Sequence, residues 1–265
     1  MRNHLKPVRM RELRAEWIKA RGSFAVWLTV AGTLANMLIF FLLYAFSADQ
    51  AMAGNPWLAY ILQHYDGIAF MMLPLFVIIL CSLVTFMEYR QGMWIALFTL
   101  PNARSRLYLG KLAFTLLLFV AAHLAFVAGM LLTGVFLGLA VPASGLLQHA
   151  PPLGIVLRLA FETVWSILGL LGLHFWLSWR FGHFIVPLTL GIVGFVGVSI
   201  QGPGWWGNAF IPYAYPIQYM PWFKGEVSLA IFQGVPLYYW LSPLYGILFT
   251  VMGIWEVRRQ QVKPS

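Results

Sequence analysis

Residues 88–111 read Glu88-Tyr-Arg-Gln-Gly-Met-Trp-Ile-Ala-Leu-Phe-Thr-Leu-Pro-Asn-Ala-Arg-Ser-Arg-Leu-Tyr-Leu-Gly-Lys111. The stretch lies between two long apolar runs, and its basic residues are Arg90, Arg104, Arg106 and Lys111. Its charged start is followed by Gly92 and by an apolar-rich piece, Met93 to Leu100, which Pro101-Asn102 ends. Basic residues beside membrane spans mark the cytoplasmic side. We therefore expect a short interfacial helix on that side, to which another protein can bind.

The composition of the whole chain is that of a protein embedded in lipid. The 265 residues are 61% hydrophobic and only 9% charged, whereas a soluble domain has about 25% charged residues. No long polar stretch leaves room for a separate soluble domain, so we expect one all-α polytopic membrane domain over residues 1–265. The net charge of +9 does not indicate nucleic acid, because the charges cluster beside apolar runs. The single cysteine, Cys81, excludes a disulfide within one chain.

Six apolar runs are each near or above the roughly 17–25 residues that cross a bilayer as a helix. They are Phe24 to Phe46, Gly67 to Met87, Leu107 to Leu139, Gly154 to Trp179, Phe184 to Ile200 and Trp240 to Val257. Six spans place fifteen of the 17 Lys and Arg residues on one side and leave Arg158 and Lys224 on the other. This bias predicts that both termini lie in the cytoplasm. The first run is longer than the roughly 7–15 residues of a signal peptide core, so we expect it to be retained.

Two flanking segments have patterns of their own. Arg9 to Ser23 predicts a helix on the membrane surface, with one apolar face formed by Leu13, Trp17, Ala20 and Phe24. Gln201 to Tyr239 is rich in aromatic residues and is broken by five prolines. It predicts either short re-entrant helices between the fifth and sixth spans or a simple aromatic belt at the interface, and both interpretations stay open.

Two short patterns carry a resemblance to a known family. The first is Glu16-x-x-Lys19 within Leu13 to Arg21, and the second is the Glu, Gly, Pro, Arg and Gly-Lys pattern of residues 88–111. Together they resemble the permeases of type-2 ABC exporters, in particular the small six-span permeases of lantibiotic and bacitracin self-protection. The resemblance implies that an ATPase docks on the residues Glu88, Arg90, Gly92, Met93, Trp94, Phe98, Pro101 and Arg104.

The resemblance also implies the partners and the activity. Two permease chains and two cytoplasmic ATPase chains would sit at a bacterial inner membrane and move a hydrophobic or amphipathic peptide, lipid or drug outward. No G-x-x-x-x-G-K-[ST] pattern occurs in the chain, so ATP and Mg would bind the partner ATPase and this chain would bind no cofactor. The alternatives are a membrane scaffold or enzyme without an ATPase partner, and a permease serving the assembly of a metalloenzyme or an extracellular polymer.

A few polar residues inside or near the spans are candidates for a site. Arg158 and Glu162 lie one helical turn apart at the outer mouth, either as a gate or substrate contact or as a structural pair.

His123 and His174 lie within spans, and their depths differ by about 9 Å at 1.5 Å per residue. This difference does not suit the two axial ligands of one haem. We expect both to be hydrogen-bonded core residues. The other histidines, His4, His64, His149 and His183, are expected in loops or tails. The glycines of Gly134-x-x-x-Gly138, Gly169-x-x-Gly172 and Gly191-x-x-Gly194-x-x-Gly197 predict close helix packing.

Overall fold

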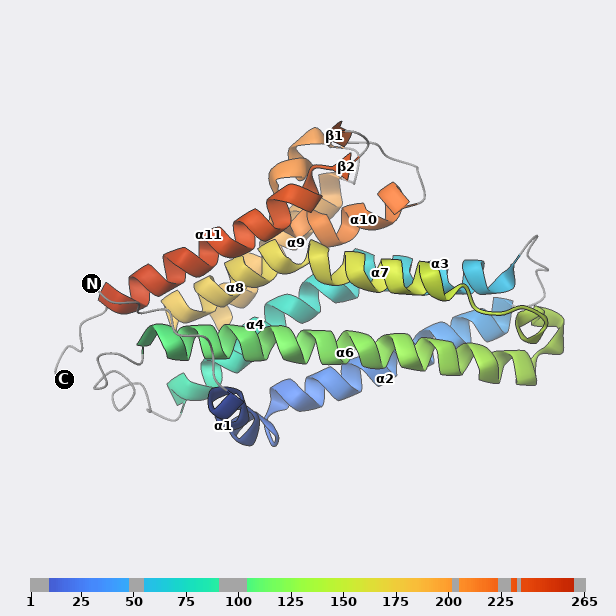
Figure 1. Ribbon diagram of the computed structural model, residues 1–265, viewed down its shortest axis with the longest axis horizontal. Helices are drawn as coiled ribbons and strands as arrows, with labels where there is room; N and C mark the ends of the chain where they lie inside the picture. Colours follow the sequence, from blue (N-terminus) through green and yellow to red (C-terminus); the bar gives the residue numbers. More distant parts are fainter. Residues whose placement is uncertain are drawn as a thin grey trace.

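The computed structural model describes residues 10–47, 55–90, 104–201, 205–223, 230–232 and 235–259. These residues form an elongated bundle of helices whose long members run side by side (Figure 1). The helices are α1 (Met10–Ala20), α2 (Phe24–Ser47), α3 (Pro56–Gly67), α4 (Leu73–Arg90), α6 (Arg104–Ala140), α7 (Leu153–Ser166), α8 (Leu168–Phe181), α9 (Ile185–Gln201), α10 (Tyr215–Phe223) and α11 (Tyr238–Arg259). The predicted all-α class is confirmed.

Each of the six apolar runs is helical, with shifted ends. Four helices are long and apolar enough to cross a membrane: Phe24–Leu43, Arg104–Ala140, Leu153–Phe181 and Tyr238–Arg259. Two shorter apolar helices cover Leu73–Met87 and Ile185–Gln201. The chain is therefore a helical membrane protein with several spans, and the count of six stays a prediction.

The second run begins earlier than its hydropathy indicates. The helix starts at Pro56, where the Asn55 side chain caps it by accepting a hydrogen bond from the Trp57 backbone N–H at 3.0 Å. It continues through a single π-helical turn, Ile68–Met72, into α4. The expected span from Gly67 leaves out α3, because the polar residues of its last turn lower the hydropathy without ending the helix, and the start of the span itself stays a prediction. His64, expected in a loop, lies buried in this turn and its Nδ1 is 2.8 Å from the Tyr60 carbonyl oxygen.

Glycines bring α8 and α11 into backbone contact. A Cβ added at Gly172 would lie 2.9 Å from the Cα of Gly246, and one added at Gly246 would lie 3.0 Å from the Leu168 carbonyl oxygen. Next to this contact, the Gly169 N–H donates to the Ser242 hydroxyl at 3.1 Å. Small residues let helices approach closely in lipid, where no hydrophobic force drives helices together. The predicted packing role of Gly169 and Gly172 is confirmed.

The other glycine patterns pack in the same way with one exception. Gly134 lies against the rings of Trp57 and Tyr60, Gly138 lies against Leu147, and Gly191 and Gly194 lie against Ile78 and Tyr213. A Cβ added at Gly197 meets no heavy atom within 4 Å in the described part of the chain. The expectation of close packing is therefore wrong for Gly197.

Replacing Gly172 by valine should destabilise the contact between α8 and α11. The added side chain meets backbone rather than a movable side chain, so the helices must separate, and overpacking of this kind costs typically about 1–3 kcal/mol. We expect a lower melting temperature of the purified protein in detergent. Gly197→Val is the matched control and should melt close to the unchanged protein, since that site is open. Equal melting of the two variants would show that the α8–α11 contact does not limit stability.

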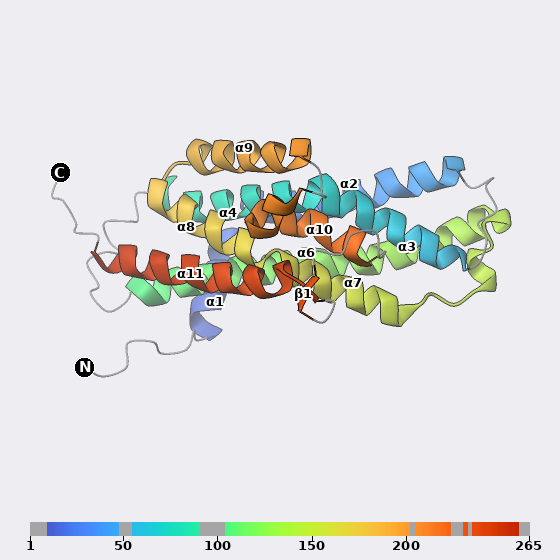
Figure 2. The ribbon, with the colours of Figure 1, turned by 90° about the horizontal axis from the view of Figure 1, so that it is seen from above.

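The segment between α9 and α11 folds into short pieces. Two 3₁₀ turns, Trp206–Phe210 and Pro212–Ala214, precede α10, and the strands β1 (Ala230–Phe232) and β2 (Val235–Pro236) pair antiparallel after it. These pieces sit part-way along the bundle, while α2, α3 and α6 extend further (Figures 1 and 2). Tyr213, Tyr215 and Tyr219 are buried against the helices. The expectation of short pieces is confirmed, and re-entry into the bilayer stays a prediction.

Candidate functional site

The short helix α1 lies at the end of the bundle where α4 ends and α6 begins (Figure 1). The last turn of α11 reaches the same end (Figures 1 and 2). The ends of α4 and α6 flank residues 91–103, which carry most of the predicted docking residues. The contacts at this end of the bundle therefore fix the two described helix ends that flank the segment.

A buried ion pair connects α1 to α6. The Lys111 ammonium donates to Glu16 Oε2 at 2.8 Å and to the carbonyl oxygen of Val84 in α4 at 3.4 Å. The Lys19 ammonium donates to the other carboxylate oxygen, Glu16 Oε1, at 3.1 Å. Lys111 is 1% exposed and Glu16 is 4% exposed. Three helices are therefore held together by one carboxylate and one ammonium, shielded from solvent.

The charges of this cluster stabilise one another. Burial alone disfavours the ionised carboxylate of Glu16, but the ammonium groups of Lys111 and Lys19 hold its pKa below the ordinary value of 4.5. Glu16 is therefore ionised at neutral pH. Removing Lys111 would leave the Glu16 carboxylate with Lys19 as its remaining ion-pair partner among the described residues, and breaking a buried ion pair in this way is strongly destabilising.

This cluster joins the two stretches that carry the family resemblance. Glu16 and Lys19 form the Glu-x-x-Lys pattern of the amino-terminal helix, and Lys111 ends the stretch that begins at Glu88. Sequence reasoning named both patterns but did not predict the pair. The available signal was Lys111 itself, the last basic residue before the long apolar part of α6, because a buried lysine needs a carboxylate partner.

The ion pair also determines which face of α1 packs on the bundle. Glu16 and Ala20 are buried and Leu13 is half-buried, whereas Trp17 is 50% exposed and Phe24 is 65% exposed. Leu13 and Ala20 of the predicted apolar face therefore pack on the bundle, whereas Trp17 and Phe24 are exposed, and the position of the helix on the membrane surface stays a prediction. The exposed aromatic residues of a surface helix suit the membrane interface.

A second set of polar contacts ties α11 to α6 and α8 at the same end. The Arg258 side chain donates from Nε to the hydroxyl of Ser105, the second residue of α6, at 2.9 Å. The Glu256 carboxylate accepts a hydrogen bond from Trp176 Nε1 at 2.9 Å and lies 3.8 Å from the Arg180 guanidinium. The first turns of α6 are therefore anchored from two sides.

The structure locates only part of the predicted docking set. Gly92, Met93, Trp94, Phe98 and Pro101 lie outside the described residues. Glu88 and Arg90 belong to the last turn of α4, and Arg104 is the half-buried first residue of α6. The two described boundaries of the segment thus lie at the end of the bundle that carries the ion pair. The docking role of these residues stays a prediction.

The outer-mouth candidates differ from each other in environment. Glu162 is 1% exposed, and its carboxylate accepts hydrogen bonds from the hydroxyls of Tyr238 at 3.1 Å and Tyr239 at 3.2 Å. Arg158, one turn earlier, is exposed. Glu162 therefore connects α7 to α11, and both interpretations of the Arg158 and Glu162 pair stay predictions. The two tyrosines were not singled out from the sequence.

The two histidines inside the spans also differ. His174 is fully buried, and its Nε2 lies 2.7 Å from the Tyr213 hydroxyl, so the expected hydrogen-bonded core residue is confirmed there. His123 stacks between Phe119 and Phe126, and its Nε2 has no hydrogen-bond partner among the described residues. The expectation of a hydrogen-bonded His123 was therefore wrong. No group of three or more His, Cys, Asp or Glu side chains in the described part of the chain is placed to hold a metal ion.

Long apolar helices and a buried charge cluster at one end of the bundle define a polytopic membrane protein. Residues 12–198 match the family model described as ABC-2 family transporter protein. The match covers well over half of the chain and includes Glu16 and Lys111, so the chain belongs to this family and is the membrane-spanning permease component of an ABC transporter. No curated protein and no solved structure matches the chain significantly.

Proposed function

We propose that this chain is the permease of an ATP-driven exporter whose ATPase is a separate cytoplasmic polypeptide. The observation that carries the proposal is the family match over residues 12–198, and the buried ion pair of Glu16 and Lys111 supports it by anchoring α6 shortly after the predicted docking segment. ATP and Mg would bind the ATPase, and two permease chains would work with two ATPase chains in a bacterial inner membrane. The cargo would be a hydrophobic or amphipathic peptide, lipid or drug, which suits apolar helix surfaces.

The dimensions of α6 support a mechanical role. Its 37 residues correspond to a rod about 55 Å long at 1.5 Å per residue. Closure of the ATPase dimer would displace residues 91–103, and the start of α6 would follow because this segment runs into it. The contacts of Glu16 and Arg258 would carry α1 and α11 along. Movements of packed helices between two discrete arrangements are a known route for such coupling.

The alternatives differ from this proposal in their partners. A scaffold or a membrane enzyme would need no ATPase, and no contact in the described residues favours either. A permease that serves the assembly of a metalloenzyme or a polymer would use the same coupling and differ only in cargo. Family membership favours the transporter class over a scaffold.

Co-purification tests the proposal. The tagged chain, extracted in a mild detergent from its own host, should bring down a P-loop ATPase in about equal amount, and the complex should hydrolyse ATP faster than the free ATPase. A chemical crosslinker added before extraction guards against loss of a weak partner. If no P-loop protein is recovered even after crosslinking, the proposed function is wrong.

A further inference from the structure

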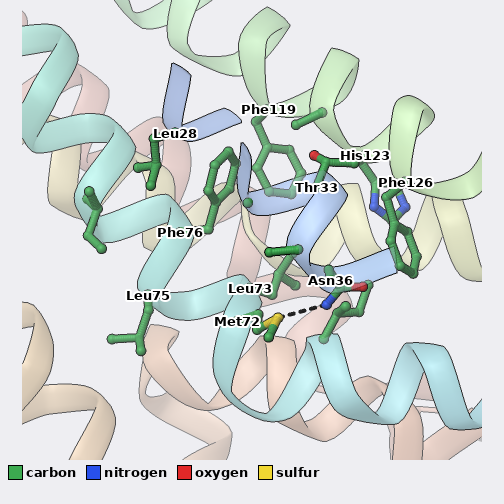
Figure 3. A pocket seen from close by; sticks show the side chains of 15 residues that line it. Leu28, Thr33, Asn36, Met72, Leu73, Leu75, Phe76, Phe119, His123 and Phe126 are labelled. Atoms are coloured by element: carbon green, nitrogen blue, oxygen red, sulfur yellow. Dashed lines mark hydrogen bonds between the residues drawn. The ribbon is translucent and has the colours of Figure 1, made fainter. Parts of the chain in front are cut away.

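A cavity of about 290 Å³ lies between α2, α6 and the helix that contains the π turn (Figure 3). Its walls are mostly apolar, with Leu28 from α2, Leu73 and Phe76 from α4, and Phe119 and Phe126 from α6. No Asp, Glu, Lys or Arg side chain is among the described residues that line it. The size is close to that of the smaller ligand sites of proteins, and the walls suit an uncharged molecule.

Two buried polar atoms in this cavity lack partners. Asn36 is 4% exposed and His123 is 6% exposed. Asn36 Oδ1 and His123 Nε2 have no hydrogen-bond partner among the described residues, and both side chains line the cavity. Leaving a buried polar atom unpaired is costly, and native proteins rarely do it. A ligand in the cavity that carries a polar group would offer these atoms a hydrogen-bond partner.

The amide of Asn36 is held in place by a contact of its own. Its Nδ2 donates to the sulfur of Met72 at 2.7 Å (Figure 3). Met72 ends the π turn, in which the Leu73 N–H bonds to the Ile68 carbonyl oxygen, and all three of these residues line the cavity. Single π turns inside α-helices occur frequently at functional sites. The irregular turn and the unpaired polar atoms are thus two separate observations at one place.

One edge of the cavity lies at the exposed surface of α2. Gly32 and Ala35 line the cavity and are themselves exposed. Their neighbours Val30, Leu34 and Leu38 are exposed apolar side chains of a helix long and apolar enough to cross the bilayer. A molecule dissolved in the lipid could therefore reach the cavity from the side.

We propose that this cavity binds one uncharged, mainly apolar molecule that carries a hydroxyl or amide group and enters from the bilayer. The hydroxyl or amide hydrogen-bonds Asn36 Oδ1 and His123 Nε2, and the apolar part lies among the leucine and phenylalanine side chains. Treating this ligand as the exported cargo rests on the proposed function. The binding itself does not, because it needs only this chain.

The test uses a decanol that carries a diazirine in its chain, with the corresponding diazirine decane as the apolar control. The full chain, without any ATPase, is placed in phosphatidylcholine nanodiscs, illuminated with each probe, and mapped by peptide mass spectrometry. The alcohol should label residues 28–36 of α2 and 119–126 of α6 at lower concentration than the alkane. If the alcohol does not label these residues preferentially, the result of the ATPase co-purification is unaffected. The ligand proposal and the proposed function can therefore be rejected separately.

Two variants with a matched control separate binding from general lipid contact. Asn36→Leu should weaken alcohol labelling about three- to tenfold, the factor expected for one lost hydrogen bond, and leave alkane labelling unchanged. Gly32→Leu should weaken labelling by both probes, because Gly32 lines the exposed edge of the cavity and a Cβ there meets no atom within 4 Å, so the larger side chain narrows the entrance. Gly197→Leu, at an equally open glycine of α9, should label like the unchanged chain. Equal labelling by alcohol and alkane, or labelling that Gly32→Leu does not change, overturns the proposal.

Discussion

Replacing Lys111 by methionine should release α1 from the bundle. The variant keeps most of the side-chain volume but leaves the buried carboxylate of Glu16 without its nearest ammonium, which lies 2.8 Å away in the unchanged chain. Removing one partner of a buried ion pair typically costs about 3–5 kcal/mol. Lys19 still contacts the other carboxylate oxygen, so we expect the lower part of this range. The measurement is the melting temperature in detergent together with protease cleavage within residues 10–23.

The double variant Glu16→Gln with Lys111→Met separates an unpaired charge from lost packing. With both charges gone, most of the stability should return, because replacing a whole buried pair by neutral groups is often close to neutral. Lys19→Met is the control for a partly exposed partner and should cost less than about 1 kcal/mol. A Lys111→Met protein that melts like the unchanged chain, with α1 still protected, would contradict a stabilising role for the pair.

The same pair gives a pH dependence with a definite sign. The folded-state pKa of Glu16 lies below its ordinary value of 4.5 because of the two lysines. The carboxylate therefore contributes stability that is fully present above pH 4.5 and is lost as the pH falls through the lower, folded-state pKa. The difference in melting temperature between the unchanged chain and Lys111→Met should therefore shrink as the pH falls below 4.5.

The helices themselves could be predicted from the sequence, because apolar composition over about twenty residues is a local property. Helix ends could not be predicted where hydropathy and helix formation diverge. Residues 56–67 are helical, yet His64 and Asp66 make them read as a loop. The glycines of α8 were predicted as a packing face because small residues have that meaning in lipid. Their partner Gly246 could not be assigned, since it lies on another helix.

The polar sites were harder to predict because their members are far apart in the chain. Glu16 and Lys111 are 95 positions apart, and no periodicity connects them. Asn36 and His123 face one cavity from α2 and α6, and only the packing of those helices against the π turn reveals it. Glu162 was noticed, but its tyrosine partners come from the start of α11. In each case one unusual residue is visible in the sequence, but its partner is known only from the packing of the helices.

Replacing Trp94 or Phe98 by alanine should uncouple the permease from its ATPase without preventing membrane insertion. Both are large apolar residues of the segment between α4 and α6, on the side that the charge bias assigns to the cytoplasm. A helix that docks on a partner does so through such apolar anchors. Burying one large apolar side chain contributes about 1.5–3 kcal/mol, so each variant should bind the ATPase at least tenfold more weakly.

The readouts are the amount of ATPase recovered with the tagged chain and the hydrolysis rate of the recovered complex. Trp240→Ala is the matched control, because this tryptophan is 59% exposed at the opposite end of α11 and should not contact the ATPase. Arg158→Ala should likewise leave the association unchanged, since it lies on α7, at the predicted outer mouth. Recovery of a fully stimulated ATPase with the Trp94 and Phe98 variants would show that residues 91–103 do not dock it. The ion pair of Glu16 and Lys111 would then keep only its role in stabilising the fold, because the proposed coupling reaches α6 through residues 91–103.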